Sequence, residues 1–579
     1  MPHAATGRVL PSLLIPLAVA GEAASAEYFV DSQAEYAALN QTVFNPGDGI
    51  FLRGGMTFNG GLFFDEQDSG NDATGRLIDP IRLTSFGGGR ATINAGDGFG
   101  VYAQDNGGFR FSNFNVRGSG VAADGSTANT GDGVSFFTAA GGDRKQDHIH
   151  LDNLDISGFG GTGLSIGGFN GDAGYNGVRV TNVAAHGNRR AGIATFGDTS
   201  VTSRNALTDV YIGDSRAYNN VGDPGSVGNT GSGIVLGGVN GGVIERSVAH
   251  DNGRNNRPSE GPVGVWAYDS QNVTIQFNES YGNRTRNGDG GGFDLDQNVT
   301  DSVVQYNYSH GNAGAGFLVF DGDGAATETA RNTVRYNVSE NDGRSGNAAA
   351  AGITIGGNVA DLRVYGNTVF ITDAAGLVNG ATIEPAIKID AFGTPGPRGV
   401  LIANNAFTTD GGGRLVFKGS GVTDSTDPDA GVRFLNNNYF AADGAFNLRW
   451  NNTTYTSLEG WLAAIDGQER LNVDGDAAAE VLALNVDPLF ADPGNGGTVG
   501  DPDALARLLA YRLRGGSPLI DAGLDLEGLL GVDPGSRDFS GNPLPVGPGL
   551  DVGAVEVPEP AAPALIAAAA AVLARRRRA

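Results

Sequence analysis

The chain has no cysteine, and this absence excludes disulfides, thiolate metal sites and a thiol nucleophile. Lysine is almost as scarce, because only Lys145, Lys388 and Lys418 occur in 579 residues. Basic residues total 38 against 64 acidic ones, which gives a formal net charge of −26. Such a surface disfavours nucleic acid as a partner, since phosphate binding relies on lysine and arginine.

Glycine, in contrast, is abundant. The chain contains 95 glycines without the every-third-residue period of collagen, and only 23 prolines. Hydrophobic residues make up 40% of the sequence and include 29 Phe and 15 Tyr, so the chain can build a core and wholesale disorder is excluded. Glycine spread this evenly is typical of an elongated repeat with a turn every few residues. We therefore expect a solenoid.

The N-terminus carries the features of a secretion signal. Residues 1–26 combine Arg8, an apolar run from Val9 to Ala20 and the small-residue site Ala24-Ser25-Ala26. We expect cleavage after Ala26, so that the exported chain begins at Glu27.

The C-terminus, residues 557–579, resembles the PEP-CTERM sorting signal. Val557-Pro558-Glu559-Pro560 precedes an apolar stretch from Ala561 to Ala574, and four arginines follow. The stretch is shorter than the roughly 18 residues of an independent membrane span. The resemblance implies a transient membrane anchor, an exosortase-type processing peptidase as partner, and a protein that a Gram-negative bacterium secretes to its surface or beyond.

The middle of the chain contains a repeat of about 30 residues. Each copy has two anchors, a four-residue segment and a later glycine that opens an alternating strand. The segments begin at Ala185, Ala217, Ala249, Ser280, Ser309 and Ser339, and the glycines are Gly192, Gly233, Gly264, Gly292, Gly316 and Gly352. Short strands of period two bury their apolar faces only by stacking on the next copy. The pattern predicts a β-solenoid.

Two columns of polar residues follow from this alignment. Asparagine tolerates the left-handed backbone of a sharp corner, and its amide can bond the equivalent amide of the next coil. We expect such a ladder at Asn188, Asn220, Asn252, Asn283 and Asn312. A second column, at His186, Tyr218, His250, Tyr281, His310 and Glu340, has a varied membership that favours a packed or half-exposed face over a metal site.

These repeats resemble those of the pectate-lyase-like superfamily, which implies an all-β fold, a right-handed parallel β-helix. The flanks at Asn45–Gly55 and Ser517–Gly523 are similar to the segments that open and close such helices. We expect an N-terminal cap at 27–96, coils at 97–440 and a closing region at 441–556. In that region Thr456-Ser457-Leu458-Glu459 predicts a capping box that opens a short helix over an end or a side of the solenoid.

A candidate site lies on the strand Gly292 to Asp296. Alternation sends Phe293 and Leu295 to the core and Asp294 and Asp296 to the outer face. The neighbouring coils place Trp266 and Tyr268, and then Leu318 and Phe320, at the aligned outward positions, while the preceding loop brings Asp289 close. Carboxylates flanked by aromatic rings suit a sugar chain, so we expect Trp266, Tyr268 and Phe320 to bind substrate.

Two mechanisms compete for these carboxylates. In a lyase, Asp289, Asp294 and Asp296 hold Ca²⁺ against a uronate while a basic residue removes a proton. Arg284 or Arg286 is nearer as a base. Lys388 lies in the Asp294 column but three coils away, about 14 Å. In a hydrolase, the carboxylates act as general acid and base across the glycosidic bond.

The resemblance supports the chemistry only in part. The stretch from Asp289 to Asp296 is loosely similar to the calcium-binding cluster of some β-helix pectate lyases, but the expected neighbouring lysine is missing, and no polygalacturonase-type Gly-His-Gly or Arg-Ile-Lys occurs. We expect a secreted protein that acts on an acidic extracellular polysaccharide. The competing hypothesis is a non-catalytic protein of the cell surface or biofilm matrix that binds polysaccharide along the same face.

Overall fold

The computed structural model describes residues 25–322, 327–372, 384–424, 430–472 and 480–557. The predicted secretion signal lies outside these ranges apart from Ser25 and Ala26, and the predicted sorting signal lies outside them apart from Val557. Within the described ranges, no helix is both long and apolar enough to cross a bilayer.

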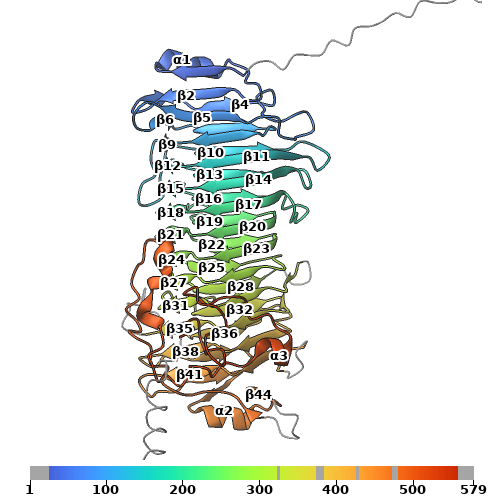
Figure 1. The fold of residues 1–579 in the computed structure, drawn as a ribbon, viewed down its shortest axis with the longest axis vertical. Coiled ribbons are helices and arrows are strands. Elements are labelled where there is room, and N and C mark those ends of the chain that lie inside the picture. Colours follow the sequence, from blue (N-terminus) through green and yellow to red (C-terminus); the bar gives the residue numbers. More distant parts are fainter. Residues whose placement is uncertain (1–24, 323–326, 373–383, 425–429, 473–479, 558–579) are drawn as a thin grey trace, which may run out of the picture.

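The chain winds into stacked coils, and each full coil adds one strand to each of three long parallel sheets (Figure 1). Sheet A contains β1 (Glu27–Val30), β2 (Gly49–Arg53), β5 (Ile81–Phe86), β8 (Phe109–Ser112), β11 (Lys145–Asp152), β14 (Gly174–Thr181), β17 (Leu207–Gly213), β20 (Val239–Glu245), β23 (Gln271–Gln276), β26 (Val303–Gln305), β30 (Thr333–Arg335), β34 (Arg363–Tyr365), β37 (Val400–Ala403) and β40 (Val432–Leu435). Sheet B contains β3 (Thr57–Asn59), β6 (Ala91–Gly96), β9 (Phe114–Gly118), β12 (Asp155–Ser157), β15 (Ala184–His186), β18 (Arg216–Tyr218), β21 (Val248–His250), β24 (Glu279–Tyr281), β27 (Tyr308–His310), β31 (Val338–Glu340), β35 (Thr368–Ile371), β38 (Ala406–Thr409) and β41 (Asn438–Ala441).

Sheet C, which carries the candidate site, contains β4 (Leu62–Phe64), β7 (Val101–Gln104), β10 (Val134–Thr138), β13 (Leu164–Gly168), β16 (Ile193–Phe196), β19 (Ile234–Gly237), β22 (Val263–Tyr268), β25 (Gly291–Leu295), β28 (Phe317–Asp321), β32 (Ile353–Gly357), β36 (Ile387–Asp390), β39 (Val416–Lys418), β42 (Leu448–Trp450) and β43 (Thr453–Tyr455). Only β43 pairs antiparallel in this sheet. Two small pairs, β29 (Thr329–Ala330) with β33 (Val359–Ala360) and β44 (Arg470–Leu471) with β45 (Glu480–Val481), complete the strands of the described residues.

The core runs along the axis of the solenoid. In sheet C one inward column comprises Ile193, Ile234, Val265, Phe293, Phe317, Ile353 and Ile387, all at most 2% exposed. The rings of Phe293 and Phe317 stack at 5.1 Å. The glycine anchors of the repeat therefore open the strands of sheet C, and the predicted fold class is confirmed.

The predicted asparagine ladder is present and fully buried. Each side-chain amide donates to the next coil, from Asn188 through Asn220, Asn252 and Asn283 to Asn312 at 2.9–3.1 Å, and Asn312 donates to Asp342. A second ladder, which the sequence analysis missed, follows another corner through Asn278, Asn307, Asn337, Asn367, Asn405 and Asn437 to Glu469. Its signal was the recurrence of asparagine with the same period of about 30 residues.

The column of histidine and tyrosine is a half-exposed stack on sheet B, as predicted. Ring centroids from His186 through Tyr218, His250 and Tyr281 to His310 are 4.6–5.1 Å apart. Among the described residues no group of three or more histidine, aspartate or glutamate side chains is placed to hold a metal ion. The column is structural packing.

Short helices cover both ends of the solenoid. Helix α1 (Gln33–Leu39) lies at the N-terminal end, where Tyr36 stacks on Phe58 at 5.0 Å. Helix α2 (Leu458–Ala464) closes the other end by burying Trp461 against Trp450, with ring centroids 5.3 Å apart. The predicted helix therefore exists, but the predicted capping box is wrong. Its N-cap is Ser457, and the third helical position is glycine.

We expect Ser457→Ala to lower the free energy of unfolding by about 1 kcal/mol, because the Ser457 hydroxyl accepts a hydrogen bond of 3.0 Å from the Gly460 amide. Thr456→Ala is the matched control, since Thr456 is exposed and precedes the cap. Urea unfolding of both variants measures the difference. A larger loss of unfolding free energy in Thr456→Ala than in Ser457→Ala would place the N-cap one residue earlier, at the position that the sequence pattern predicted.

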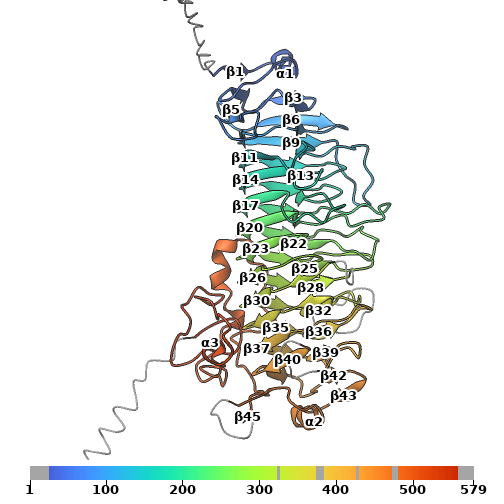
Figure 2. The same ribbon diagram turned by 90° about the vertical axis from the view of Figure 1, so that its right-hand side faces the viewer.

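The segment after the last coil folds back along sheet B (Figures 1 and 2). It contains 3₁₀ turns at Pro502–Arg507 and Leu509–Tyr511 and helix α3 (Leu526–Leu530). Buried carboxylates of the coils hold it: Glu279 accepts from the amides of Val499 and Gly500, and Glu340 accepts from the Tyr511 hydroxyl. This segment leaves the outer face of sheet C to its own loops.

Candidate functional site

The outer face of sheet C carries two columns of side chains that meet the candidate site. Strand pairing aligns Trp266, Asp294, Leu318, Thr354 and Lys388 in the first column. Continuation of the same pairing aligns Tyr268, Asp296, Phe320, Gly356 and Asp390 in the second. The register therefore places the aromatic residues one coil above and one coil below the two aspartates.

Asp294 is buried, and its predicted exposure is wrong. Its exposed fraction is 2%, and its column neighbours Trp266 and Leu318 are only 9% and 6% exposed. The outer face is not bare, because the loop that carries Asp289 lies close to Asp294 and is tied by a hydrogen bond of 2.7 Å from the Gly261 amide to Asp289 Oδ2. Asp296, Asp289, Tyr268 and Phe320 are half-buried and partly open to solvent.

The pKa values of the three carboxyl groups are all raised. Burial is the largest cause in each case. It raises the pKa of Asp296 to about 7 together with the charge of Asp289, and it raises the pKa of Asp289 to about 6. The pKa of Asp294 lies well above its usual range because of burial and the charges of Asp296 and Asp289. At neutral pH the three groups therefore carry fewer than three negative charges.

Two polar atoms at the site lack partners. Asp294 Oδ1 and Trp266 Nε1 are fully buried without a hydrogen bond, and the two residues pair directly in adjacent strands. A buried polar atom without a partner costs free energy unless a ligand or water supplies the bond. These two atoms are the least satisfied part of this face.

The predicted bases lie apart from the carboxylates. Arg286 is exposed, and its guanidinium donates to Asn255 Oδ1 at 2.8 Å and to the Arg254 carbonyl. Lys388 lies three coils from Asp294 in the same column. Within the described part of the chain, neither Asp289, Asp294 nor Asp296 forms an ion pair. The structure thus places the carboxylates beside the aromatic residues but not beside a basic side chain.

The three carboxylates also do not fit the expected calcium site. Hard cations of this kind require several converging oxygen ligands. No group of three or more acidic or histidine side chains in the described ranges has such a placement.

Lys388 belongs to a second charged group further along the face, defined here as the basic group of Lys388, Arg414 and Arg449. Lys388 Nζ and the Arg449 guanidinium lie 5.3 and 5.4 Å from the ring of Phe417. Burial lowers the pKa of Lys388, while Glu384 and Asp390 raise it, yet neither of these carboxylates pairs with it within 4.0 Å. The sequence analysis identified only Lys388, because the others come from neighbouring coils and a loop.

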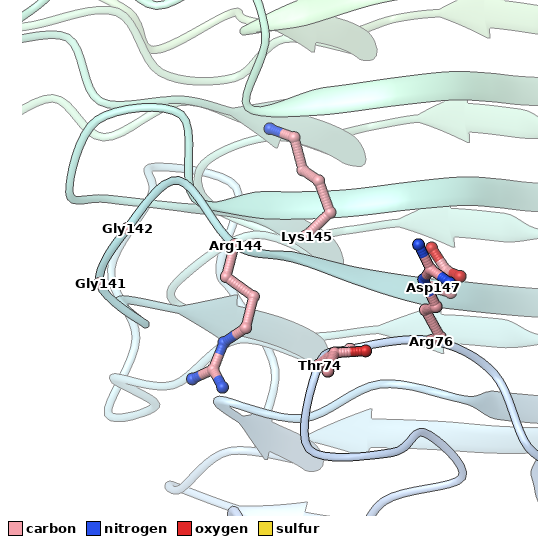
Figure 3. A pocket seen from close by; sticks show the side chains of 8 residues that line it. Thr74, Arg76, Gly141, Gly142, Arg144, Lys145 and Asp147 are labelled. Atoms are coloured by element: carbon pink, nitrogen blue, oxygen red, sulfur yellow. The ribbon is translucent and has the colours of Figure 1, made fainter.

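A separate pocket of about 630 Å³ lies near the N-terminal end of the solenoid (Figure 3). Arg76, Arg144, Lys145 and Asp147 line it, but Figure 3 shows the Lys145 and Arg144 side chains pointing apart. The Lys145 ammonium donates to the carbonyl oxygens of Asp172, Asn205 and Ala206. The pocket contains none of the predicted site residues.

Comparison with known proteins supports the architecture. A family model described as a right handed beta helix region matches residues 176–369, and no curated protein matches the chain. Among solved structures, the GH136 lacto-N-biosidase from Eubacterium ramulus is 16% identical over 68% of this chain and 67% of that one, with a TM-score of 0.43. Pectate lyase Pel9A is 16% identical over 93% of this chain and 97% of that one (TM-score 0.33).

The PL6 family alginate lyase AlyGC is 15% identical over 80% of this chain and 60% of that one, with a TM-score of 0.41. Identities at this level concern the fold alone. The stacked parallel sheets and the matched family model show that the chain folds as a right-handed parallel β-helix of repeats.

Proposed function

We propose that this protein is a secreted glycoside hydrolase that cleaves an acidic extracellular polysaccharide at Asp289, Asp294 and Asp296. The observation that carries the proposal is the presence of three neighbouring carboxylates with raised pKa values and no paired cation. Hydrolysis requires one carboxyl group that keeps a proton and one that has lost it. Carboxylates whose environments separate their protonation states meet this requirement.

The exposure of the three groups assigns their roles. Asp296 is accessible and has a pKa of about 7, so it retains a proton at neutral pH in a useful fraction of molecules and donates it to the glycosidic oxygen. Asp289 has a pKa of about 6, is mostly ionised and serves as the base toward water or as the nucleophile. Asp294 stays neutral beneath them, and with an exposed fraction of 2% it has no contact with the sugar.

The aromatic residues suit a sugar substrate. Tyr268 and Phe320 are half-buried on either side of Asp296 in the second column. Sugar rings pack their apolar faces on such rings. The basic group on the same face favours a polymer that carries carboxylates, because Lys388 has no hydrogen bond or ion pair to a described residue.

Export belongs to the same proposal. The N-terminal signal and the PEP-CTERM-like C-terminus support secretion, transient membrane attachment and processing by an exosortase-type peptidase. Removal of both ends leaves an acidic chain, which suits a soluble extracellular protein better than one adsorbed to anionic lipid.

A non-catalytic polysaccharide-binding protein is the second candidate. The burial of Asp294 and Trp266 favours it, because a reacting sugar must reach groups that the loops now cover. A lyase is less well supported, since the predicted bases Arg286 and Lys388 lie away from the carboxylates.

Product analysis separates these possibilities. Purified protein is incubated with alginate and with polygalacturonate, in calcium and in chelator, and both reducing ends and the ultraviolet absorbance of unsaturated uronates are followed. Hydrolysis predicts new reducing ends without absorbance, in both buffers. Reducing ends with a rise in absorbance would identify a lyase and overturn the hydrolase proposal. Polymer retention without any product would favour the binding protein.

A further inference from the structure

The outer face of sheet C also carries a cluster of aromatic residues several coils before the carboxylates, of which one is exposed and two are half-buried. Phe137, Phe169 and Phe196 form one cluster, named here the aromatic platform. Phe169 is 45% exposed, and its ring lies 6.0 Å from that of Phe137 and 5.6 Å from that of Phe196. The rings of Phe137 and Phe196 are 6.4 Å apart and nearly parallel. Exposed apolar clusters of this kind mark a binding surface.

The aromatic platform is continuous with the candidate site. Phe137 and Phe196 occupy the second column, the one that contains Tyr268 and Asp296. Phe196 precedes Asp296 by three coils, about 14 Å along the axis. Tyr268 stands between them, one coil before Asp296. A sugar chain that passes over Asp296 parallel to the solenoid axis therefore meets Tyr268 and then the aromatic platform.

Glycines in the same column shape this surface. Gly167 separates Phe137 from Phe196, and Gly237 separates Phe196 from Tyr268. A Cβ at Gly167 would lie 2.6 Å from the Phe196 ring, and a Cβ at Gly237 would overlap the Tyr268 ring. Each ring thus leans over the glycine of the preceding coil. Asp296 occupies the position at which the alternation of ring and glycine would place the next glycine.

Phe320, on the other side, leans away from Asp296. Its ring lies 3.2 Å from the Cβ position of Gly356 in the following coil and meets the ring of Phe392 edge to face at 5.6 Å. The two flanking rings therefore diverge, toward Gly237 in one direction and toward Gly356 in the other.

From this arrangement we infer that the aromatic platform is a distal binding site for the same polysaccharide chain, several sugar residues from the bond held at Asp296. The inference rests on the proposed function for the position of the bond, but binding itself needs no catalysis. It assigns the substrate as a long polymer whose sugar rings present apolar faces, because three phenylalanine rings offer dispersion contact and no hydrogen bonds. Short fragments that fill only the positions around Asp296 do not reach it.

The test compares polymer binding by Phe137→Ala/Phe169→Ala with binding by Phe29→Ala. Phe29 is 56% exposed and stacks on Phe51 in sheet A, so its variant controls for the loss of a similar ring on another face. Each change is made in the Asp296→Asn background to prevent cleavage. Affinity electrophoresis in alginate and in polygalacturonate reports retention by each polymer, and circular dichroism checks folding.

We expect the platform variant to lose about tenfold in affinity for the retained polymer, while the Phe29 variant stays within twofold. In the active background, cleavage of the polymer falls at low substrate concentration, whereas cleavage of a short oligosaccharide is unchanged. Equal retention of both variants overturns the inference even if products show hydrolysis. Failure of the parent to bind either polymer also overturns it.

Two further outcomes are informative. Retention that depends on the platform without any product would support the platform and reject the hydrolase. If light scattering shows that the parent is a dimer and that the platform variant is a monomer with unchanged polymer affinity, the cluster is an interface between two copies of this chain, and the inference fails.

Discussion

Asp296→Asn is expected to lower the rate of polysaccharide hydrolysis by about 10²–10⁴-fold, because it removes the accessible carboxyl that holds a proton near neutral pH. The substitution keeps the size and the planar shape of the side chain. The measurement is the initial rate of reducing-end release at saturating substrate, with polymer affinity measured in parallel. Affinity is expected to change little, so that the loss appears in kcat rather than in KM.

The same substitution is expected to stabilise the fold at pH 8. An ionised Asp296 is unfavourable in its half-buried setting, as its raised pKa indicates, and asparagine carries no charge. Loss of activity together with a higher melting temperature is typical of a residue retained for chemistry at the expense of stability. A merely structural aspartate would instead destabilise the protein when replaced.

Asp301→Asn is the matched control. Asp301 is exposed, and its ion pair with Arg331 at 2.7 Å lowers its pKa. It lies in the same coil as Asp296 but at the opposite end of a turn, on the approach to sheet A. Its variant should retain activity within twofold. An Asp296→Asn protein that also stays within twofold of the parent would remove Asp296 from the mechanism and leave the binding-protein hypothesis ahead.

The repeat made most of the fold predictable from sequence. Each copy shows the inward residues of one strand and one corner asparagine, and stacking leaves a single register in which both align. The first asparagine ladder was therefore predicted residue by residue. The second has the same period, from Asn278 to Asn437, but it lies at the corner between the strands of sheets A and B, just before the first anchor of each repeat.

The site was less predictable because alternation specifies a direction and not what covers the side chain. It correctly sends Asp294 and Asp296 outward from the solenoid core, yet Asp294 is only 2% exposed while Asp296 is half-buried. Loop paths depend on contacts between coils. The hydrogen bond from the Gly261 amide to Asp289 joins two loops that belong to different repeats. No local sequence pattern in either repeat predicts it.

The closing segment illustrates the same limit. The sequence predicted a helix after the coils, and α2 does cover the last coil through Trp461. The return of residues 494–511 along sheet B depends on buried carboxylates such as Glu279 and Glu340, whose partners lie 156 or more positions away in the chain. Isolated acidic residues in a strand do not reveal such partners.

Buried acidic groups are thus a general feature of this solenoid. They cap the ladders, hold the C-terminal segment and form the candidate site. Burial raises the pKa of Glu469, at the end of the second ladder, to about 7 and that of Asp342, at the end of the first, to about 6. Asp551 and Glu556 in the C-terminal segment are raised to about 6 and about 7.

The fold is therefore expected to lose stability as pH rises from about 4 to about 7. In the unfolded chain these groups titrate near pH 4. A raised folded-state pKa means that the folded protein binds more protons in this window, so stability is greatest below it and declines until each group has passed its folded pKa. Every pH unit between the two pKa values of one group corresponds to about 1.4 kcal/mol. Groups with lowered values, such as Asp198 at about 2, act below this window.

Urea unfolding at pH 5 and at pH 8 measures the effect, and the midpoint should be lower at pH 8. Glu469→Gln is the diagnostic variant, because it mimics the protonated carboxyl that accepts from the Asn437 amide at 2.8 Å and from the Tyr439 hydroxyl at 2.6 Å. It should reduce the pH dependence chiefly by raising the midpoint at pH 8. A parent midpoint that is higher at pH 8 than at pH 5 would mean that the buried carboxylates are ionised without cost, and the neutral state of Asp294 and the acid role assigned to Asp296 would lose their physical basis.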